Sequence, residues 1–110
     1  MTSTAHTAFF GDAEYTFRFT RPLILELETK CGAGIGAICH RMFARQFTQT
    51  DIAETIRLSA IGGGASPKRA AELIAAYVAD RPLSDSYPLA AKILEKLWFG
   101  NPSEAANGQA

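Results

Sequence analysis

Residues 14–20, "EYTFRFT", carry the strongest structural signal in the chain, because apolar and polar side chains alternate strictly along them. A period of two is typical of a β-strand with one face buried and the other exposed to water. The apolar face consists of the aromatic side chains of Tyr15, Phe17 and Phe19. A two-stranded ribbon cannot shield such a face by itself, so the sequence predicts that helices pack over it.

A turn signal precedes this strand. Gly11-Asp12 separates two strand-like runs, and glycine at the first central position of a two-residue loop suits a type II′ turn. We therefore expect residues 5–10 and 13–20 to pair as an antiparallel β-hairpin.

Helical signals dominate the rest of the chain. The segment between Pro22 and Gly32 also fits a strand, because Leu23, Leu25 and Leu27 alternate, but its terminal proline and glycine favour a helix. A second helix is expected over residues 35–43, where Phe43 falls in the apolar series of the inner side. Further helices are expected from Asp51 to the glycines 62–64, from Ser66-Pro67 to residue 78, and over residues 88–99. The predicted fold is α+β, an N-terminal antiparallel β-hairpin packed against a bundle of four to five helices.

Three local details complete this prediction. Asp51 with Glu54 three residues later predicts a capping box at the start of the third helix. The segment 80–88, "DRPLSDSYP", is expected to separate the last two helices. Gly36 is expected to allow two helices to approach each other closely.

Length and composition are those of a small globular domain. Of the 110 residues, 47% are hydrophobic and 20% are charged, as in an ordinary soluble protein. We expect a single domain over residues 1–100 and a disordered tail over residues 101–110. Eleven basic and eleven acidic residues cancel, so no overall positive field draws the chain to nucleic acid or to an anionic membrane.

Export and membrane insertion are not predicted. No uncharged apolar run approaches the roughly 18 residues of a membrane helix. The N-terminal residues "MTSTAHTAFF" lack a basic segment followed by an apolar core. Two cysteines do not make a disulfide framework, which favours a reducing compartment. A cytoplasmic location without a membrane partner is expected.

A glycine motif in residues 30–42, "KCGAGIGAICHRM", raises the question of a cofactor. Gly32, Gly34 and Ala37 fit the pattern G-x-G-x-x-A of dinucleotide-binding loops, and Asp51 lies about where a ribose-binding acid is found. That fold also needs a second parallel strand ending near Asp51, but the intervening residues continue the helical period. The glycines are better explained as a helix stop and a linker, and no cofactor is expected.

The cysteines and histidines do not form a recognisable chemical site. Zinc sites need about four ligands at short spacings, whereas Cys31, Cys39 and His40 are joined only by His6 as a further imidazole. Cys39 falls on the apolar face of its helix, where a thiol acts as a small hydrophobe. His40 points about 100° away from it, so it cannot serve as its base. We expect no metal site and no catalytic residues.

Basic residues on two helices raise the possibility of DNA binding. Arg41 and Arg45 are four residues apart on one side of the second helix, and Lys68-Arg69 opens the fourth. The turn between the third and fourth helices is too long for a helix-turn-helix. The fourth helix also lacks side chains suited to reading base edges. Nucleic acid is therefore not expected as a partner.

The chain resembles a known family in the order of its apolar segments and turn glycines. It is similar to the small gene transfer agent proteins, which are grouped with phage tail tube and tail assembly chaperone-like proteins. The resemblance covers about residues 9–100 and implies a role in building the tail of a phage-like particle, without catalytic residues. The segments that carry it are "YTFRF", "LILELETKCGAGI", "DIAETIRLSAIGGG", "AAELIAAYVADRPL" and "AAKILEKLWFG".

Two surfaces are candidates for partner contacts. On the last helix Trp98 is expected in the core, whereas Phe99 falls opposite the buried stripe, unless it folds back onto the hairpin. On the third helix Leu58 and Ile61 point nearly opposite to Ile52 and Ile56. Either that helix is buried on both sides, or Leu58 and Ile61 bind a partner. Arg41 and Arg45 complete the set of candidate contacts.

These observations favour a non-enzymatic protein that acts in tail morphogenesis of a gene transfer agent. It would be a tail assembly chaperone or a component associated with the tail tube, in the cytoplasm or incorporated in the particle. Its partners would be other tail proteins, of the tail tube or tape-measure type. The alternative is a small DNA-associated helical regulator of the same particle cluster, and a nucleotide-binding enzyme fragment is a distant third.

Overall fold

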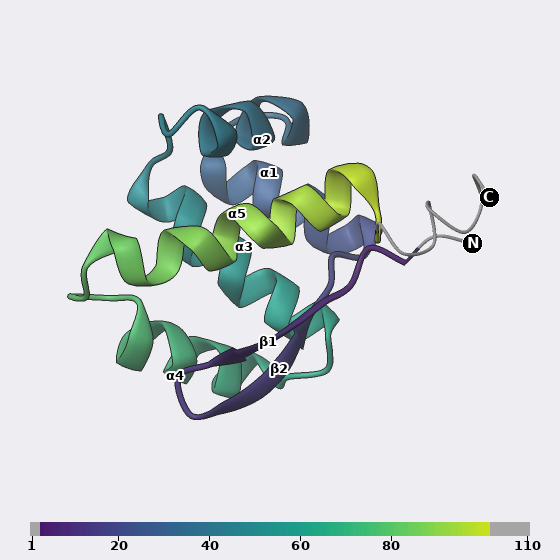
Figure 1. Cartoon of the computed structure of the whole chain (residues 1–110). Helices are drawn as coiled ribbons and strands as arrows, with labels where there is room; N and C mark the ends of the chain where they lie inside the picture. The colour runs from purple at the N-terminus through teal and green to yellow at the C-terminus, as the bar shows by residue number, and fades with distance from the viewer. Residues whose placement is uncertain (1–2, 102–110) are drawn as a thin grey trace.

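The structure, a computed structural model, describes residues 3–101 and confirms the α+β class. A two-stranded antiparallel sheet is followed by five helices (Figure 1). The strands are β1 (His6–Phe10) and β2 (Ala13–Phe17). The helices are α1 (Arg21–Cys31), α2 (Ile35–Phe43), α3 (Gln49–Gly62), α4 (Pro67–Tyr77) and α5 (Leu83–Phe99). The predicted tail lies, apart from Asn101, outside the described residues.

The hairpin has the predicted register around its turn. Phe10 pairs with Ala13 across Gly11-Asp12. Gly11 has φ +69°, whereas Asp12 is not among the residues with positive φ, as a type II′ turn requires. Strand β2 is shorter than predicted and ends at Phe17, because the chain beyond it pairs with α3 rather than with β1.

The termini of α1 and α4 agree with the sequence signals. Pro22 lies in the first turn of α1, and Gly32 ends that helix with a left-handed φ of +67°, which establishes the helix instead of the strand. At α4 the side chain of Ser66 accepts a hydrogen bond from the N–H of Arg69, and Pro67 is the first helical residue.

Helix α3 begins two residues earlier than predicted, with a different capping box. Thr48 is the N-cap, and its hydroxyl accepts a 3.0 Å hydrogen bond from the N–H of Asp51. The carboxylate of Asp51 in turn accepts a 3.0 Å bond from the N–H of Thr48. Asp51 is therefore the acidic partner of the box rather than its cap, and Glu54 bonds to Arg57 instead.

Helix α5 begins at Leu83 and includes Pro88, so the prediction of a break up to residue 88 was wrong. A proline inside a helix leaves the carbonyl four residues earlier without its N–H donor. Here that carbonyl belongs to Ser84, which is exposed like Pro88 itself, so water can solvate it.

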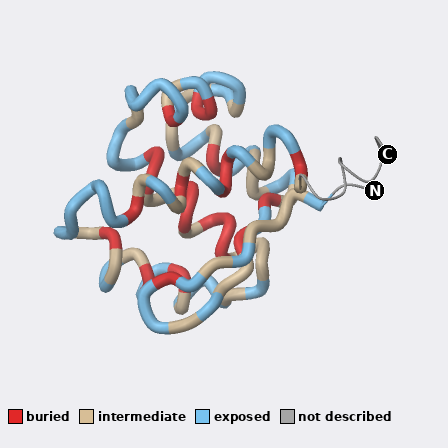
Figure 2. Tube along the Cα trace, viewed as in Figure 1, coloured by how far each residue is buried: buried red, intermediate tan, exposed pale blue. Residues whose placement is uncertain are grey.

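Helix α3 is the centre of the fold: α1, α4, α5 and β2 all pack against it. It runs through the middle of the molecule, and much of it is buried (Figure 2). Its core side chains come from opposite sides of the helix, since Ile52, Ile56 and Leu58 are all fully buried. No helix between residues 3 and 101 combines the length and the apolarity needed to cross a membrane.

The glycines at the end of α3 let the main chains of the hairpin and α3 touch. A Cβ atom at Gly62 would collide with the carbonyl oxygen of Arg18, and one at Gly63 with that of Thr16. Beside them the N–H of Arg18 donates a 2.9 Å hydrogen bond to the carbonyl of Ser59. Gly36, in contrast, has nothing within 4 Å of where its Cβ would be, so the predicted close helix approach there was wrong.

Candidate interaction face on helices α2 and α5

Helix α5 has one buried side and one exposed side. Its buried residues include Ala90, Ile93 and Leu94, which face α3 and the rest of the core. The side chains of Pro88, Lys92, Glu95 and Phe99 lie on the opposite side of the helix, and all four residues are exposed. This exposed stripe lies next to α2, which packs alongside α5.

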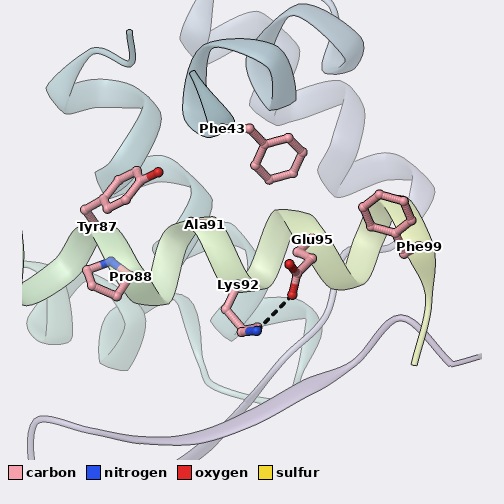
Figure 3. A pocket seen from close by; sticks show the side chains of 7 residues that line it. All are labelled: Phe43, Tyr87, Pro88, Ala91, Lys92, Glu95 and Phe99. Carbon is pink, nitrogen blue, oxygen red and sulfur yellow. Dashed lines mark hydrogen bonds and ion pairs between the residues drawn. The ribbon is translucent and has the colours of Figure 1, made fainter. Parts of the chain in front are cut away.

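A hollow of about 410 Å³ lies on this side of the molecule (Figure 3). Helix α5 lines it with the residues of its exposed stripe, and Phe43 at the end of α2 lies across from them. The lining residues are Phe43, Tyr87, Pro88, Ala91, Lys92, Glu95 and Phe99.

Two smaller hollows adjoin the first one. The hollow of about 250 Å³ shares Phe43 and Phe99 with it and also contains Gly36 and Trp98. The hollow of about 360 Å³ shares Tyr87 and Pro88 with the first and is lined further by Arg45, Phe47, Leu83 and Ser84. Together the three hollows form one continuous surface, which we call the α2–α5 face.

Large apolar side chains are concentrated on the α2–α5 face. Among the described residues six large hydrophobic side chains are exposed, and four of them lie here. Their exposed fractions are 43% for Phe43, 50% for Leu83, 59% for Trp98 and 70% for Phe99. Scattered exposed apolar residues are normal, whereas a contiguous group of this kind is typical of interaction sites and makes the face a candidate for one.

Polar contacts hold the face in shape. The hydroxyl of Tyr87 donates a 2.9 Å hydrogen bond to the carbonyl of Met42, and its ring stacks on Phe47 at 4.9 Å. The guanidinium of Arg45 lies 5.6 Å from the centre of the Tyr87 ring. These contacts link α5 to the end of α2 and to the loop that follows it.

One ion pair lies in the middle of the exposed stripe. The Lys92 ammonium lies 2.9 Å from the Glu95 carboxylate. This hydrogen bond is the main reason that the pKa of Glu95 is lowered below its ordinary value. Both side chains are about half exposed, so the pair remains accessible to further charged groups.

The predicted contact residues differ in how far the structure buries them. Phe99 is exposed and lies on the α2–α5 face, but Trp98 is exposed as well, so its expected core position was wrong. Leu58 is fully buried and Ile61 is partly buried against the core. Helix α3 is therefore buried on both sides, and Leu58 is not available to a partner.

The two arginines do not lie side by side on one helix. Arg41 forms a two-pronged ion pair with Asp51, with Nε–Oδ2 and Nη2–Oδ1 distances of 3.0 and 2.7 Å. Arg45 lies beyond the end of α2 with φ +60°. At the start of α4, Arg69 bonds to Asp12 and to the hydroxyl of Tyr15. Arg41 and Arg69 thus have structural partners.

Asp51 ties three helices together. Burial alone would raise the pKa of its carboxyl, but hydrogen bonds from Thr48 and Arg41 outweigh this effect and hold the pKa below its ordinary value. Arg41 also reaches the carbonyl of Cys31, the last residue of α1. The residue that fitted a ribose-binding acid is thus part of a structural ion pair.

The cysteines have no activated thiol. Burial is the main cause that raises the pKa of Cys31 to about 12 and that of Cys39 to about 11. Both thiols are therefore protonated at neutral pH and are poor nucleophiles. Between residues 3 and 101, no three His, Cys, Asp or Glu side chains are grouped closely enough to hold a metal ion.

The sequence pattern missed most of the α2–α5 face. Phe43 was assigned to the inner side of α2, and the contributions of Leu83 and Tyr87 were lost because α5 was predicted to begin at residue 88. One signal was available: Pro88, Glu95 and Phe99 recur on one side of a helix, at spacings of seven and four residues.

Comparison with known proteins identifies a family. The profile of the family described as "Phage tail tube protein, GTA-gp10" matches residues 3–100, nearly the whole chain. No curated protein and no solved structure shows significant similarity to the chain.

Proposed function

Because the chain belongs to the gene transfer agent tail family described as "Phage tail tube protein, GTA-gp10", and so has a tail-related role, we propose that it acts in tail morphogenesis through protein contacts. It would do so as a tail assembly chaperone or as a component associated with the tail tube. The observation that carries the proposal is the family match over residues 3–100.

The α2–α5 face supports a mode of action through protein contacts. Exposed aromatic anchors contribute much of the binding energy in protein interfaces, and Phe99 and Trp98 project from this face. The chain has no net charge, which fits protein partners better than nucleic acid. We propose other tail proteins, of the tail tube or tape-measure type, as partners, and no enzymatic activity.

The first experiment compares two phenylalanines in cells that produce the particles. The gene is deleted and replaced by wild type, by Phe99→Ala or by Phe9→Ala. Phe9 is the matched control, since its side chain is 71% exposed but lies on β1 and lines none of the three hollows of the α2–α5 face. We expect Phe99→Ala to reduce the number of tailed particles in electron micrographs, whereas Phe9→Ala does not. Normal tails with Phe99→Ala would contradict the role of the face.

The second experiment separates the two forms of the proposal. Mass spectrometry of purified wild-type particles measures whether the protein remains in them. Many copies per particle are expected of a tail component. Its absence from normal particles, together with defective tails after gene deletion, is expected of a chaperone. Normal tailed particles after gene deletion would contradict both forms.

A further inference from the structure

The exposed stripe of α5 has a symmetric order of side chains. Pro88, Lys92, Glu95 and Phe99 follow one another at spacings of four, three and four residues, so they lie within a narrow sector of the helix surface. An apolar residue stands at each end, and two opposite charges stand between them. When the stripe is aligned with a reversed copy of itself, Pro88 lies opposite Phe99. Lys92 then lies opposite Glu95.

This order makes the stripe complementary to itself in an antiparallel arrangement. A two-fold axis between residues 93 and 94 would place Lys92 of one copy opposite Glu95 of the other, twice. The same axis would place Phe99 opposite Pro88 of the second copy, beside the hollow that Tyr87 and Phe43 line. Each copy therefore supplies both a projecting aromatic ring and a hollow for its partner's ring, as two-fold symmetric interfaces require.

We propose that the α2–α5 face binds a second copy of this chain, through antiparallel pairing of the two α5 helices along residues 88–99. The inference rests on the proposed function in one respect, that this face is a protein-contact surface, and it adds the identity of one occupant. In the pair, the Lys92–Glu95 bridge of each copy becomes part of a network of four alternating charges. Such complementary charges set the orientation and the register of an interface.

The charges favour a second copy over a strongly charged partner. Lys92 and Glu95 balance each other at the centre of the stripe, with Lys96 and the His6 imidazole of β1 close by, so an acidic helix would meet Glu95 and a basic helix would meet the lysines. A neutral partner with the reverse order of charges avoids both conflicts, and an antiparallel copy of α5 has this order. The paired segment is about 18 Å long. Because this is short for a stable interface, we expect a dissociation constant on the order of 10–100 µM.

The test uses charge reversal and the recombination of variants. Purified wild type, Lys92→Glu, Glu95→Lys and an equimolar mixture of the two variants are compared by analytical ultracentrifugation. In each variant alone, like charges face each other across the axis, and we expect dimerisation to weaken at least about tenfold. In the mixture, two glutamates face two lysines, and we expect a one-to-one heterodimer at least as tight as the wild-type dimer.

Two controls keep the result specific. Lys68→Glu reverses an exposed charge on α4, away from the face, and is expected to leave the dimer unchanged. Melting curves establish that all variants are folded, as expected for exposed positions.

Three outcomes would overturn the inference: a wild-type protein that is monomeric at about 500 µM, well above the expected constant, variants that dimerise like wild type, or a mixture that stays monomeric. The particle counts with Phe99→Ala are a separate measurement. A monomeric protein whose Phe99→Ala variant still loses tails would refute the dimer and leave the proposed function standing.

Discussion

Large apolar side chains are buried in one region of this small protein and exposed in another. The hairpin, α1, α4 and α5 all pack around α3, and the hairpin comes so close that Gly62 and Gly63 leave no room for a Cβ atom. On the α2–α5 face, Phe43, Trp98 and Phe99 remain exposed although they are among the largest apolar side chains in the chain. The difference between the two regions lies in the number of neighbouring elements. Helix α3 is surrounded by four elements, whereas α5 contacts α2 and, to a smaller extent, β1 beside its exposed stripe.

This contrast indicates that the two regions contribute to different properties of the protein. The region around α3 provides the free energy of folding through burial and direct main-chain contacts. The α2–α5 face leaves apolar area exposed to water. The favourable free energy of burying that area is gained only when another molecule covers it. Substitutions in the two regions should therefore affect different measurements.

The largest effect is expected at the main-chain contact between α3 and the hairpin. Gly63→Ala should lower the free energy of unfolding by more than about 3 kcal/mol, because its Cβ would collide with the carbonyl of Thr16 and neither backbone can yield easily. Gly36→Ala is the control, since the space there is open, and it should change stability by no more than about 1 kcal/mol. Similar urea midpoints for both variants would refute the close contact.

The next effect concerns Leu58. Its side chain is fully buried, so Leu58→Ala should cost about 2–5 kcal/mol, as core leucine truncations do. Chemical denaturation measures this cost. A decrease in the free energy of unfolding below about 1 kcal/mol would contradict the buried position of Leu58.

The two arginines provide a smaller contrast. Arg41→Ala leaves the buried Asp51 carboxylate without its ion-pair partner and should cost about 3 kcal/mol at neutral pH. Arg45→Ala, which removes an exposed side chain, should cost less than about 1 kcal/mol. Equal losses for the two variants, measured by urea denaturation, would contradict the structural role of Arg41.

The cost of Arg41→Ala should also depend on pH. Since the folded state lowers the pKa of Asp51 below 3.8, the stabilisation is present above that pH and is lost as the pH falls through the folded-state pKa. The difference in stability between wild type and Arg41→Ala should therefore shrink in acid below about pH 4. Repeating the urea titrations from pH 7 to pH 3 tests this, and a constant difference would contradict it.

The smallest effect on stability is expected on the α2–α5 face. Trp98→Ala and Phe99→Ala should each change the free energy of unfolding by less than about 1 kcal/mol, because both side chains are mostly exposed. Leu94→Ala, one turn before Trp98 but fully buried, should cost about 2–5 kcal/mol. If Trp98→Ala melts as early as Leu94→Ala, the aromatic rings contribute to the core after all.

Much of the fold could be predicted from local signals. The alternation in residues 14–20 and the glycine at position 11 predicted the hairpin, and Ser66-Pro67 predicted the start of α4. These features depend only on neighbours within a few residues, so a short stretch of sequence contains the interactions that determine them. The start of α5 could not be predicted in this way, because a proline in a helix is tolerated only when the freed carbonyl reaches solvent.

The candidate site was less predictable than the fold. Phe99 was placed on the exposed side of its helix, and the structure has it there. Trp98 lies at the edge of the buried stripe, and whether such a position is covered depends on how far α2 extends along α5. Phe43 was assigned to the inner side of α2, but it is nearly half exposed.

The sequence by itself determined the class of the fold, the hairpin turn, most helix ends and the family to which the chain belongs. Each of these follows from periodicity, from turn and cap residues, or from their order along the chain. The tertiary structure alone decided that Leu58 is core and Trp98 is surface, and that Gly62 and Gly63 touch the hairpin. The physical reason is that burial and close approach depend on elements remote in the sequence: Gly62 meets Arg18 only after the helices have packed, and no local pattern records that contact.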